Sequence, residues 1–224
     1  MTLGATGLTP TRKMASCLRG SSRHNGGMEF PARAIYGLDI ETDTTIDGRD
    51  PLVARILSVA VATADRSTCV IFESHDEREM LESLNATLNA LPAGMVATWN
   101  GSGFDLAFLM HRASVHNVVL DWQVTDSDRT SKYPPVLGTV LQGTLGPHRH
   151  VDVAYAFMEY ATDNNVKWSL KPVARSLGME PVEVDRANTH LLSREVLAEY
   201  VASDAVVTAR LAEILKERIT LWVD

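Results

Sequence analysis

Two carboxylates, Asp39 and Glu41, stand two positions apart at the end of an apolar stretch of the sequence. If this stretch is a strand, both side chains project to one side and Ile40 points to the other, because side chains alternate along a strand. Carboxylates held this close repel each other unless a cation lies between them, and Mg²⁺ prefers oxygen ligands. The pair predicts a site for Mg²⁺ or Mn²⁺, with a solvated strand edge as the alternative interpretation.

A third acidic residue, Asp105, follows a glycine-containing segment that begins at Trp99. The glycines permit a tight connection from a strand to a helix, and Asn100 is a favourable turn residue. An aspartate at the start of a helix can also serve simply as a cap. Asp105 is therefore a candidate metal ligand or a capping residue.

Tyr200 and Asp204 lie four residues apart in a helical pattern near the C-terminus. Residues with this spacing share one face of a helix, so the phenol and the carboxylate point in the same direction. Alternatively, Tyr200 is a core aromatic in line with Leu197 and Val207, and Asp204 is solvated. Taken singly, the pair favours this second interpretation.

Together, the three segments resemble the three exonuclease motifs of the DEDD superfamily. Leu38–Thr42 is similar to the first motif, Asn100–Asp105 to the second, and Tyr200 with Asp204 to the third. In the histidine subclass, a histidine precedes the last aspartate by five residues, whereas this position is Glu199 here. The match is therefore to the tyrosine (DEDDy) subclass, and most closely to the proofreading exonuclease domains of family B DNA polymerases.

This resemblance covers roughly Ile35 to Leu215 and implies a 3′ to 5′ exonuclease that releases nucleoside 5′-monophosphates by a two-metal-ion mechanism. It also implies a role for eight residues. Two divalent cations, Mg²⁺ or Mn²⁺, would be bound by Asp39, Glu41, Asp105 and Asp204. Tyr200 would orient the attacking water, and the positions that resemble substrate contacts are Thr42, Asn100 and Phe104.

The partner implied by the resemblance is a nucleic acid with a free 3′ end. We expect single-stranded DNA, and with it a role in proofreading or DNA repair, because the resemblance is closest to DNA proofreading domains. An RNA-processing exoribonuclease of the same superfamily is one alternative, because a motif does not encode recognition of the 2′-hydroxyl. A non-catalytic nucleic-acid-binding domain is the other.

Two further groups of residues have types suited to binding. Lys167 and Lys171 flank Trp168, and such a set can grip a nucleic-acid strand. Its alternative is two solvated lysines with the tryptophan packed on the core. His148 and His150 lie close to an aspartate in the sequence, but we expect this second group to face solvent rather than to bind a metal.

Composition limits the class of protein. The chain has 224 residues and 45% hydrophobic residues, which fits one α/β domain, and no apolar run approaches the roughly 20 residues of a membrane span. A formal net charge of −7 counts against a general DNA-coating protein, although bound cations would invert the local field at a nuclease site. Cys17 and Cys69 are too few for a disulfide framework or a zinc site, so we expect a cytoplasmic protein.

The elements that must position these side chains follow from hydrophobic periodicity. Strands are predicted over residues 34–40, 54–63, 69–73, 95–99 and 150–154. Helices are predicted over 76–91 and 104–115, and in pieces over 165–222, with a break at 178–181 and an N-cap at Ser193. Prolines and glycines in 121–147 indicate a loop and a hairpin arm.

Residues 1–28 show neither the strand period nor the helix period and are expected to form a disordered tail. Met28 is an alternative start of the protein, and residues 29–224 are expected to form the exonuclease domain. The order of the predicted elements indicates an α/β fold. Its central mixed sheet would be flanked by helices, and the first three strands would form a meander. The resemblance implies an RNase H-like fold, which agrees with this prediction.

Overall fold

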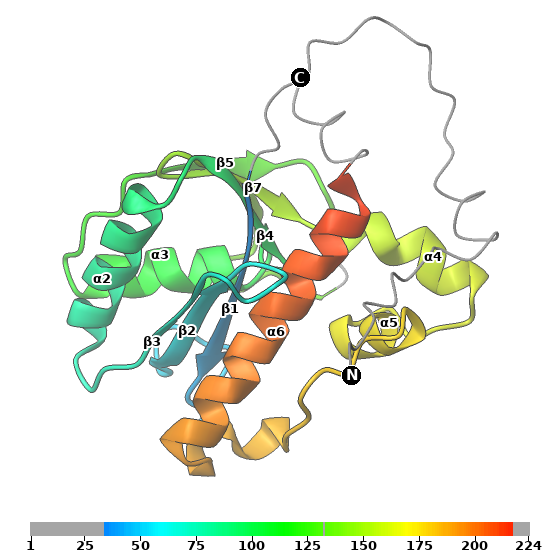
Figure 1. The fold of residues 1–224 in the computed structure, drawn as a ribbon. Helices are drawn as coiled ribbons and strands as arrows, with labels where there is room; N and C mark the ends of the chain where they lie inside the picture. The colour runs from blue at the N-terminus through cyan, green and yellow to red at the C-terminus, as the bar shows by residue number, and fades with distance from the viewer. Residues whose placement is uncertain (1–33, 132, 217–224) are drawn as a thin grey trace, which may run out of the picture.

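A computed structural model describes residues 34–131 and 133–216 of the chain. The predicted tail, the alternative start at Met28 and the end of the last predicted helix lie outside these residues. The described chain forms one seven-stranded sheet in the order β3-β2-β1-β4-β7-β6-β5, with helices on both faces (Figure 1). This mixed sheet flanked by helices is the predicted α/β architecture.

The inner strand β1 (Ala34–Thr42) has neighbours of both orientations. It pairs antiparallel with β2 (Ile56–Ala62) and parallel with β4 (Gly94–Thr98). The short β3 (Cys69–Phe72) adds antiparallel to β2. These pairings confirm the predicted meander of the first three strands.

The outer half of the sheet comes from the stretch predicted as a loop and a hairpin arm. β5 (Trp122–Ser127) and β6 (Val140–Leu145) pair antiparallel, which confirms the hairpin. The hairpin is not a separate arm, because β6 pairs with β7 (His148–Asp152) and β7 pairs parallel with β4. Because the hairpin is part of the sheet, its buried residues Leu141 and Leu145 belong to the same apolar core as those of β1.

Helices form a layer on each face of the sheet. α2 (Glu77–Ala90) and α3 (Asp105–Val115) cover one face, with the β1 side chains at even positions, such as Leu38, buried against them. The other face carries α4 (Met158–Asp163), α5 (Leu170–Ser176) and the long α6 (Arg194–Ile214), which crosses the sheet in Figure 1. Two short 3₁₀ helices, η1 (Tyr155–Phe157) and η2 (Arg186–Leu191), connect these helices to the rest of the chain.

The predicted N-cap at Ser193 is confirmed, and Asp76, the first residue of its predicted helix, is the N-cap of α2. The Asp76 side chain accepts hydrogen bonds from the backbone at Arg78 and Glu79 and so caps α2, and the Ser193 side chain caps α6 by accepting one from Val196. Within the described residues, each helix is too short or too polar to cross a membrane.

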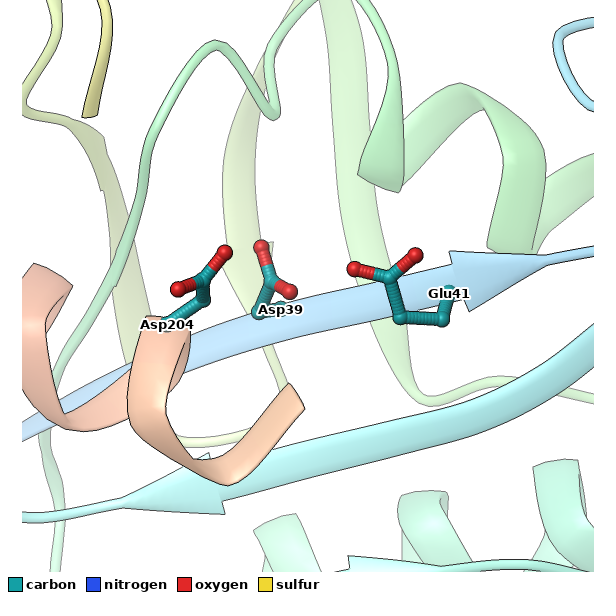
Figure 2. Close-up of side chains that lie close together, drawn as sticks. All are labelled: Asp39, Glu41 and Asp204. Carbon is teal, nitrogen blue, oxygen red and sulfur yellow. The ribbon is translucent and has the colours of Figure 1, made fainter. Parts of the chain in front are cut away.

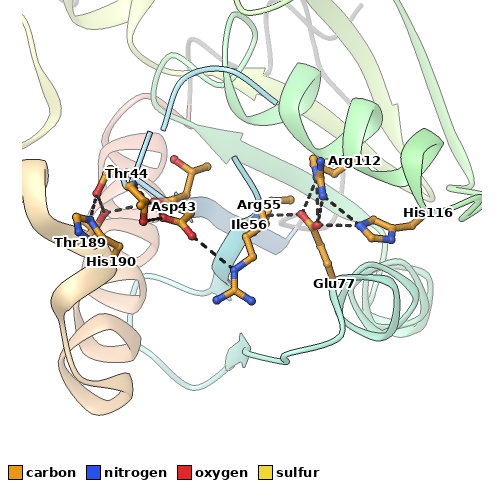
Figure 3. Close-up of polar contacts among 11 residues, drawn as sticks. Asp43, Thr44, Arg55, Ile56, Glu77, Arg112, His116, Thr189 and His190 are labelled. Atoms are coloured by element: carbon orange, nitrogen blue, oxygen red, sulfur yellow. Dashed lines mark hydrogen bonds and ion pairs between the residues drawn. The ribbon is translucent and has the colours of Figure 1, made fainter. Parts of the chain in front are cut away.

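A buried carboxylate, Glu77, ties α2 to α3 and to the sheet (Figure 3). It accepts a hydrogen bond of 2.8 Å from the backbone N–H of Ile56 and forms an ion pair of 2.5 Å with Arg112. His116 Nε2 lies 2.8 Å from the same carboxylate. Because a buried charge without partners is costly, these contacts fix the layer of α2 and α3 against β2.

Candidate active site

Three carboxylates from two elements meet on the α6 face of β1. Asp39 and Glu41 project from the same side of the strand, and Asp204 reaches them from α6 (Figure 2). One ligand oxygen of each of the three residues lies within 4.8 Å of the others. We call Asp39, Glu41 and Asp204 the acid cluster, which is an arrangement that can bind a divalent cation.

Close packing of α6 on β1 brings the acid cluster together. A Cβ atom at Gly37 would lie 1.9 Å from the backbone oxygen of Ala205, so a larger residue would not fit at this position. Gly37 lies two residues before Asp39 on the same face of β1, and Ala205 directly follows Asp204 in α6. The glycine thus allows the helix to approach the strand until the carboxylates converge.

Asp105 lies beside the acid cluster but outside it. It is the first residue of α3 and is buried, and the N-cap residue of that helix is Phe104, which makes no side-chain capping bond. The capping alternative for Asp105 therefore does not describe the structure. Asp105 lines the same cleft as the acid cluster, and its charge contributes to the raised pKa of Asp39.

Burial raises the pKa values of all four acids, and repulsion from a neighbouring carboxylate adds to each shift. Asp204 repels Asp39 and Glu41, whereas the repelling carboxylate is Asp152 for Asp105 and Glu183 for Asp204. Desolvation is the largest cause in each case, and it raises the pKa of Glu41 to about 8, of Asp105 to about 7 and of Asp204 to about 6. The pKa of Asp39 is also raised well above its usual value, first by burial and then by Asp204 and Glu41. Divalent cations would relieve this repulsion, so the donor set fits oxygen-binding metals such as Mg²⁺ or Mn²⁺.

Two protein cations face the acid cluster. Lys171 Nζ lies 3.3 Å from Asp204 Oδ1 and 3.8 Å from the centre of the Tyr200 ring, and it donates a hydrogen bond to the Val182 carbonyl. Lys171 is buried, so the prediction of a solvated lysine is wrong for it, because α5 packs against α6 at this point. The other two residues of this group fit the alternative interpretation, because Lys167 is exposed to solvent and Trp168 packs on the core.

The second cation, Arg186, comes from η2, which docks on the end of β1. Thr44 Oγ1 lies 2.7 Å from His190 Nδ1 and 3.2 Å from Thr189 Oγ1 (Figure 3). The Thr189 hydroxyl donates a hydrogen bond of 3.3 Å to the Thr42 carbonyl. Sequence reasoning missed Arg186, because no local period or spacing links it to an acid cluster formed by two other elements.

Tyr200 combines features of both interpretations of its position. Its side chain is fully buried, as a core aromatic would be, yet it shares a helix face with Asp204. Among the described residues, its hydroxyl has no hydrogen-bond partner. Burial, followed by the charges of Glu41 and Asp204, raises its pKa, so the group stays a neutral phenol that can donate a hydrogen bond.

The acid cluster lies in a cleft of about 580 Å³, and the three predicted substrate positions line it. The Thr42 hydroxyl donates a hydrogen bond of 2.6 Å to the Gly48 carbonyl. Asn100 adopts a positive φ of 64°, which fits the turn role considered for it. Phe104 packs near Phe108, with ring centres 5.5 Å apart. Their contact with substrate stays a prediction.

The expectation that His148 and His150 face solvent is wrong. Both are buried, because β7 lies inside the sheet between β4 and β6. His148 Nε2 lies 2.6 Å from the Leu88 carbonyl, and His150 Nε2 lies 2.8 Å from Thr98 Oγ1. Both histidines therefore contribute to the interior of the sheet.

Comparison with known proteins agrees with the fold. A solved structure similar to the chain is the family B DNA polymerase from the hyperthermophilic archaeon Pyrobaculum calidifontis, with a TM-score of 0.63 over 83% of this chain. The identity is 23%, so the likeness concerns the fold, and the chain spans only 25% of that polymerase. No curated protein has a significant sequence match to the chain.

A family model provides the assignment. It describes the RNase_H superfamily and matches residues 37–194, more than half of the chain. The matched region includes Asp39, Glu41 and Asp105 and ends before the segment that carries Tyr200 and Asp204. Nucleases of this fold class usually use divalent metals, and the acid cluster is a candidate site for them. With its mixed sheet, its acidic cleft and this match, the chain belongs to the RNase_H superfamily.

Proposed function

We propose that the protein is a metal-dependent 3′ to 5′ exonuclease of the DEDDy type, with single-stranded DNA as its favoured substrate. The observation that carries this proposal is the convergence of Asp39, Glu41 and Asp204 within 4.8 Å, with Asp105 beside them. The similarity to the fold of a DNA polymerase supports the choice of DNA. A role in proofreading or repair and a cytoplasmic location stay predictions from the sequence.

The four carboxylates would hold the metal ions. Two ions of Mg²⁺ or Mn²⁺, in our proposal, would supply Lewis-acid chemistry there, which would lower the pKa of an attacking water and neutralise charge on the leaving 3′ oxygen. The Lys171 ammonium group, 3.3 Å from Asp204 Oδ1, holds that side chain on the cleft side of α6. The carboxylates thus bind and orient the metal ions. Because their pKa values are raised, to about 8 for Glu41, about 7 for Asp105 and about 6 for Asp204, metal binding should strengthen as pH rises from about 5 to 8.

The Tyr200 hydroxyl would orient the attacking water by donating a hydrogen bond to it. A phenol with a raised pKa does not act as a base at neutral pH, so its role is to position rather than to remove a proton. Phe104 offers an aromatic surface for the terminal base, and Thr42 and Asn100 offer polar groups along the same cleft. This arrangement suits a strand end held across the acid cluster.

The test is digestion of matched 3′-labelled and 5′-labelled single-stranded DNA and RNA with Mg²⁺ or Mn²⁺. We expect stepwise loss from the 3′ end, inhibition by a chelator and faster digestion of DNA. Asp39→Asn should abolish cleavage, whereas Asp126→Asn, on the exposed outer strand β5, should leave it unchanged. Thermal melting of both variants distinguishes loss of chemistry from loss of fold.

The outcomes separate the alternatives. Faster digestion of RNA under the same conditions would replace DNA by RNA as the substrate. Binding of either polymer without metal-dependent cleavage would support the non-catalytic nucleic-acid-binding domain. Cleavage from the 5′ end would contradict the proposed direction.

A further inference from the structure

A second cleft, of about 410 Å³, lies on the outer half of the sheet. Its lining is polar and includes two arginines, Arg129 and Arg149, together with Thr125, Gln142 and Thr144. The proposed exonuclease chemistry uses none of these side chains. The cleft therefore needs a separate explanation.

Part of the second cleft shares a face of the sheet with the acid cluster: Arg149 and Val151 stand on that face, whereas His150 and Asp152 of the same strand stand on the other. Gly37 pairs with Ala97 and Ala97 pairs with Val151, and residues paired across neighbouring strands share a face. Alternate residues of one strand also share a face, so Asp39 lies on the side of Gly37 and Arg149 on the side of Val151. A strand bound at the acid cluster can therefore continue over this surface.

The floor of the second cleft is a polar surface of β5, β6 and β7. Arg149 pairs with Thr144, and Gln142 pairs with Thr125, so these side chains stand together on one face. Arg149, Gln142 and Thr125 are exposed, whereas the opposite face of the same strands carries buried apolar residues such as Leu141. Exposed threonine, glutamine and arginine side chains can donate hydrogen bonds to phosphate and sugar oxygens.

A single turn separates the two clefts. Asn100 lines the cleft of the acid cluster, and Ser102 lines the second cleft. The Asp152 carboxylate holds this turn by accepting hydrogen bonds of 2.8 Å from the Asn100 backbone and 3.0 Å from the Ser102 backbone. The two clefts are therefore neighbours on either side of this turn.

The connection between β5 and β6 runs from one cleft to the other. Arg129 lines the second cleft and Tyr133 lines the cleft of the acid cluster. Between them, the Ser131 hydroxyl donates a hydrogen bond of 3.4 Å to Asn100 Oδ1 in the separating turn. One short segment thus contributes a cation to the second cleft and an aromatic ring to the first.

The charge of the second cleft suits an anionic ligand. Burial lowers the pKa of His150 to about 3, so this lining residue is neutral at physiological pH. The Asp152 carboxylate also lines the cleft, where it accepts hydrogen bonds from the backbone N–H groups of Asn100, Ser102 and Ala154, and burial raises its pKa to about 6. Arginine guanidinium groups match the geometry of phosphate oxygens.

We propose that the second cleft binds the sugar-phosphate backbone of the substrate strand, on the 5′ side of the terminal nucleotide held at the acid cluster. Arg129 and Arg149 contact phosphates, and the polar floor of β5 and β6 contacts the backbone between them. This inference rests on the proposed exonuclease function for its orientation. It makes the enzyme sensitive to substrate length, because only a strand that spans both clefts gains these contacts.

The test compares a short and a long substrate in the full-length protein. The variant is Arg129→Gln with Arg149→Gln, and the matched control is Arg78→Gln, an exposed arginine of α2 in the layer on the opposite face. Binding of thymidine 3-mers and 20-mers is measured by fluorescence anisotropy in a chelator at several salt concentrations. Digestion of both lengths is measured with Mg²⁺, and kcat is separated from KM.

We expect the double variant to bind the 20-mer about tenfold more weakly for each arginine removed. The slope of log affinity against log salt should become shallower by about 1.4, which corresponds to two lost phosphate contacts on a single strand. KM should rise for the 20-mer at unchanged kcat, and both values should stay the same for the 3-mer. The control should match the unmodified protein.

Equal loss on both substrate lengths, or equal loss in the Arg78→Gln control, would overturn the proposal. Unchanged 20-mer binding in the double variant would also overturn it. If the unmodified protein cleaves neither length, the proposed exonuclease function fails. The binding arm then still decides whether the second cleft holds a nucleic-acid strand.

Discussion

At the scale of single residues, the main question is whether Tyr200 acts in the reaction or only fills the core. It is fully buried, and among the described residues its hydroxyl has no hydrogen-bond partner. A phenylalanine in its place would keep the ring packing and the ring contact with Lys171, whose ammonium group lies 3.8 Å from the ring centre. The hydroxyl alone can therefore be tested.

We expect Tyr200→Phe to reduce turnover by about 10-fold to 10³-fold, the range associated with loss of a positioning or proton-transfer contact. Stability should be unchanged or slightly higher, because the removed hydroxyl has no described partner. Single-turnover digestion and thermal melting check the two expectations. Normal turnover in the variant would leave Tyr200 as a core aromatic.

At the scale of elements, the contact of α6 with β1 determines whether the acids meet. Gly37→Ala would place a Cβ atom 1.9 Å from the backbone oxygen of Ala205, and relieving this clash requires a shift of the α6 backbone, which costs stability. We expect a loss of stability of about 1 to 3 kcal/mol, together with weaker Mg²⁺ binding and lower activity, because α6 must carry Asp204 away from Asp39. Urea unfolding and metal titration measure these effects.

The matched control for this glycine is Gly94→Ala. Its added Cβ would lie 2.1 Å from the Ala34 backbone oxygen, at the start of β1 and away from the acid cluster. We expect this variant to lose stability but to bind Mg²⁺ normally below its melting temperature. Similar metal binding in both variants would show that the approach of α6 at Gly37 does not position the acids.

The layer of α2 and α3 depends on a buried charge, and this too can be tested. Glu77→Gln would leave Arg112 partly buried without its full partner, and we expect a loss of about 3 kcal/mol. Glu82→Gln, which breaks the exposed pair with Arg78, should cost less than about 1 kcal/mol. Urea unfolding compares the two. Equal effects would mean that the burial of Glu77 is not decisive.

At the scale of the whole molecule, the acidic site makes stability depend on pH and on metal. The folded-state pKa values of Glu41, Asp105 and Asp204 are raised to about 8, 7 and 6, above unfolded values near 4. The folded state therefore binds more protons than the unfolded state. The contribution of these protonated carboxyl groups to the free energy of unfolding is full below about pH 4 and is lost as pH rises toward 8. Carboxylates with lowered pKa values, such as Glu77, titrate at more acidic pH.

We therefore expect the metal-free protein to lose free energy of unfolding as pH rises from about 5 to 8. Mg²⁺ should restore it, and more strongly at pH 8 than at pH 5, because the metal binds ionised carboxylates in the folded state. Urea unfolding at four pH values with chelator or with excess Mg²⁺ measures both trends. A stability that is constant or increasing with pH in chelator would contradict the repulsion inferred for the acid cluster.

The sequence by itself determined the local geometry of the site. The period of a strand puts Asp39 and Glu41 on one side, and the period of a helix puts Tyr200 and Asp204 on one face. The cap at Ser193 and the mixed sheet were also predicted, because each depends on neighbouring residues or on element order.

Only the tertiary structure decided which distant groups meet. The sheet order buried His148 and His150, which local polarity had suggested were exposed. Packing of α5 on α6 buried Lys171, and docking of η2 on β1 brought Arg186 to the cleft. The second cleft likewise exists only because β7 joins the hairpin to the central sheet. Such contacts depend on how closely separate elements approach, which backbone packing sets and local spacing along the chain does not.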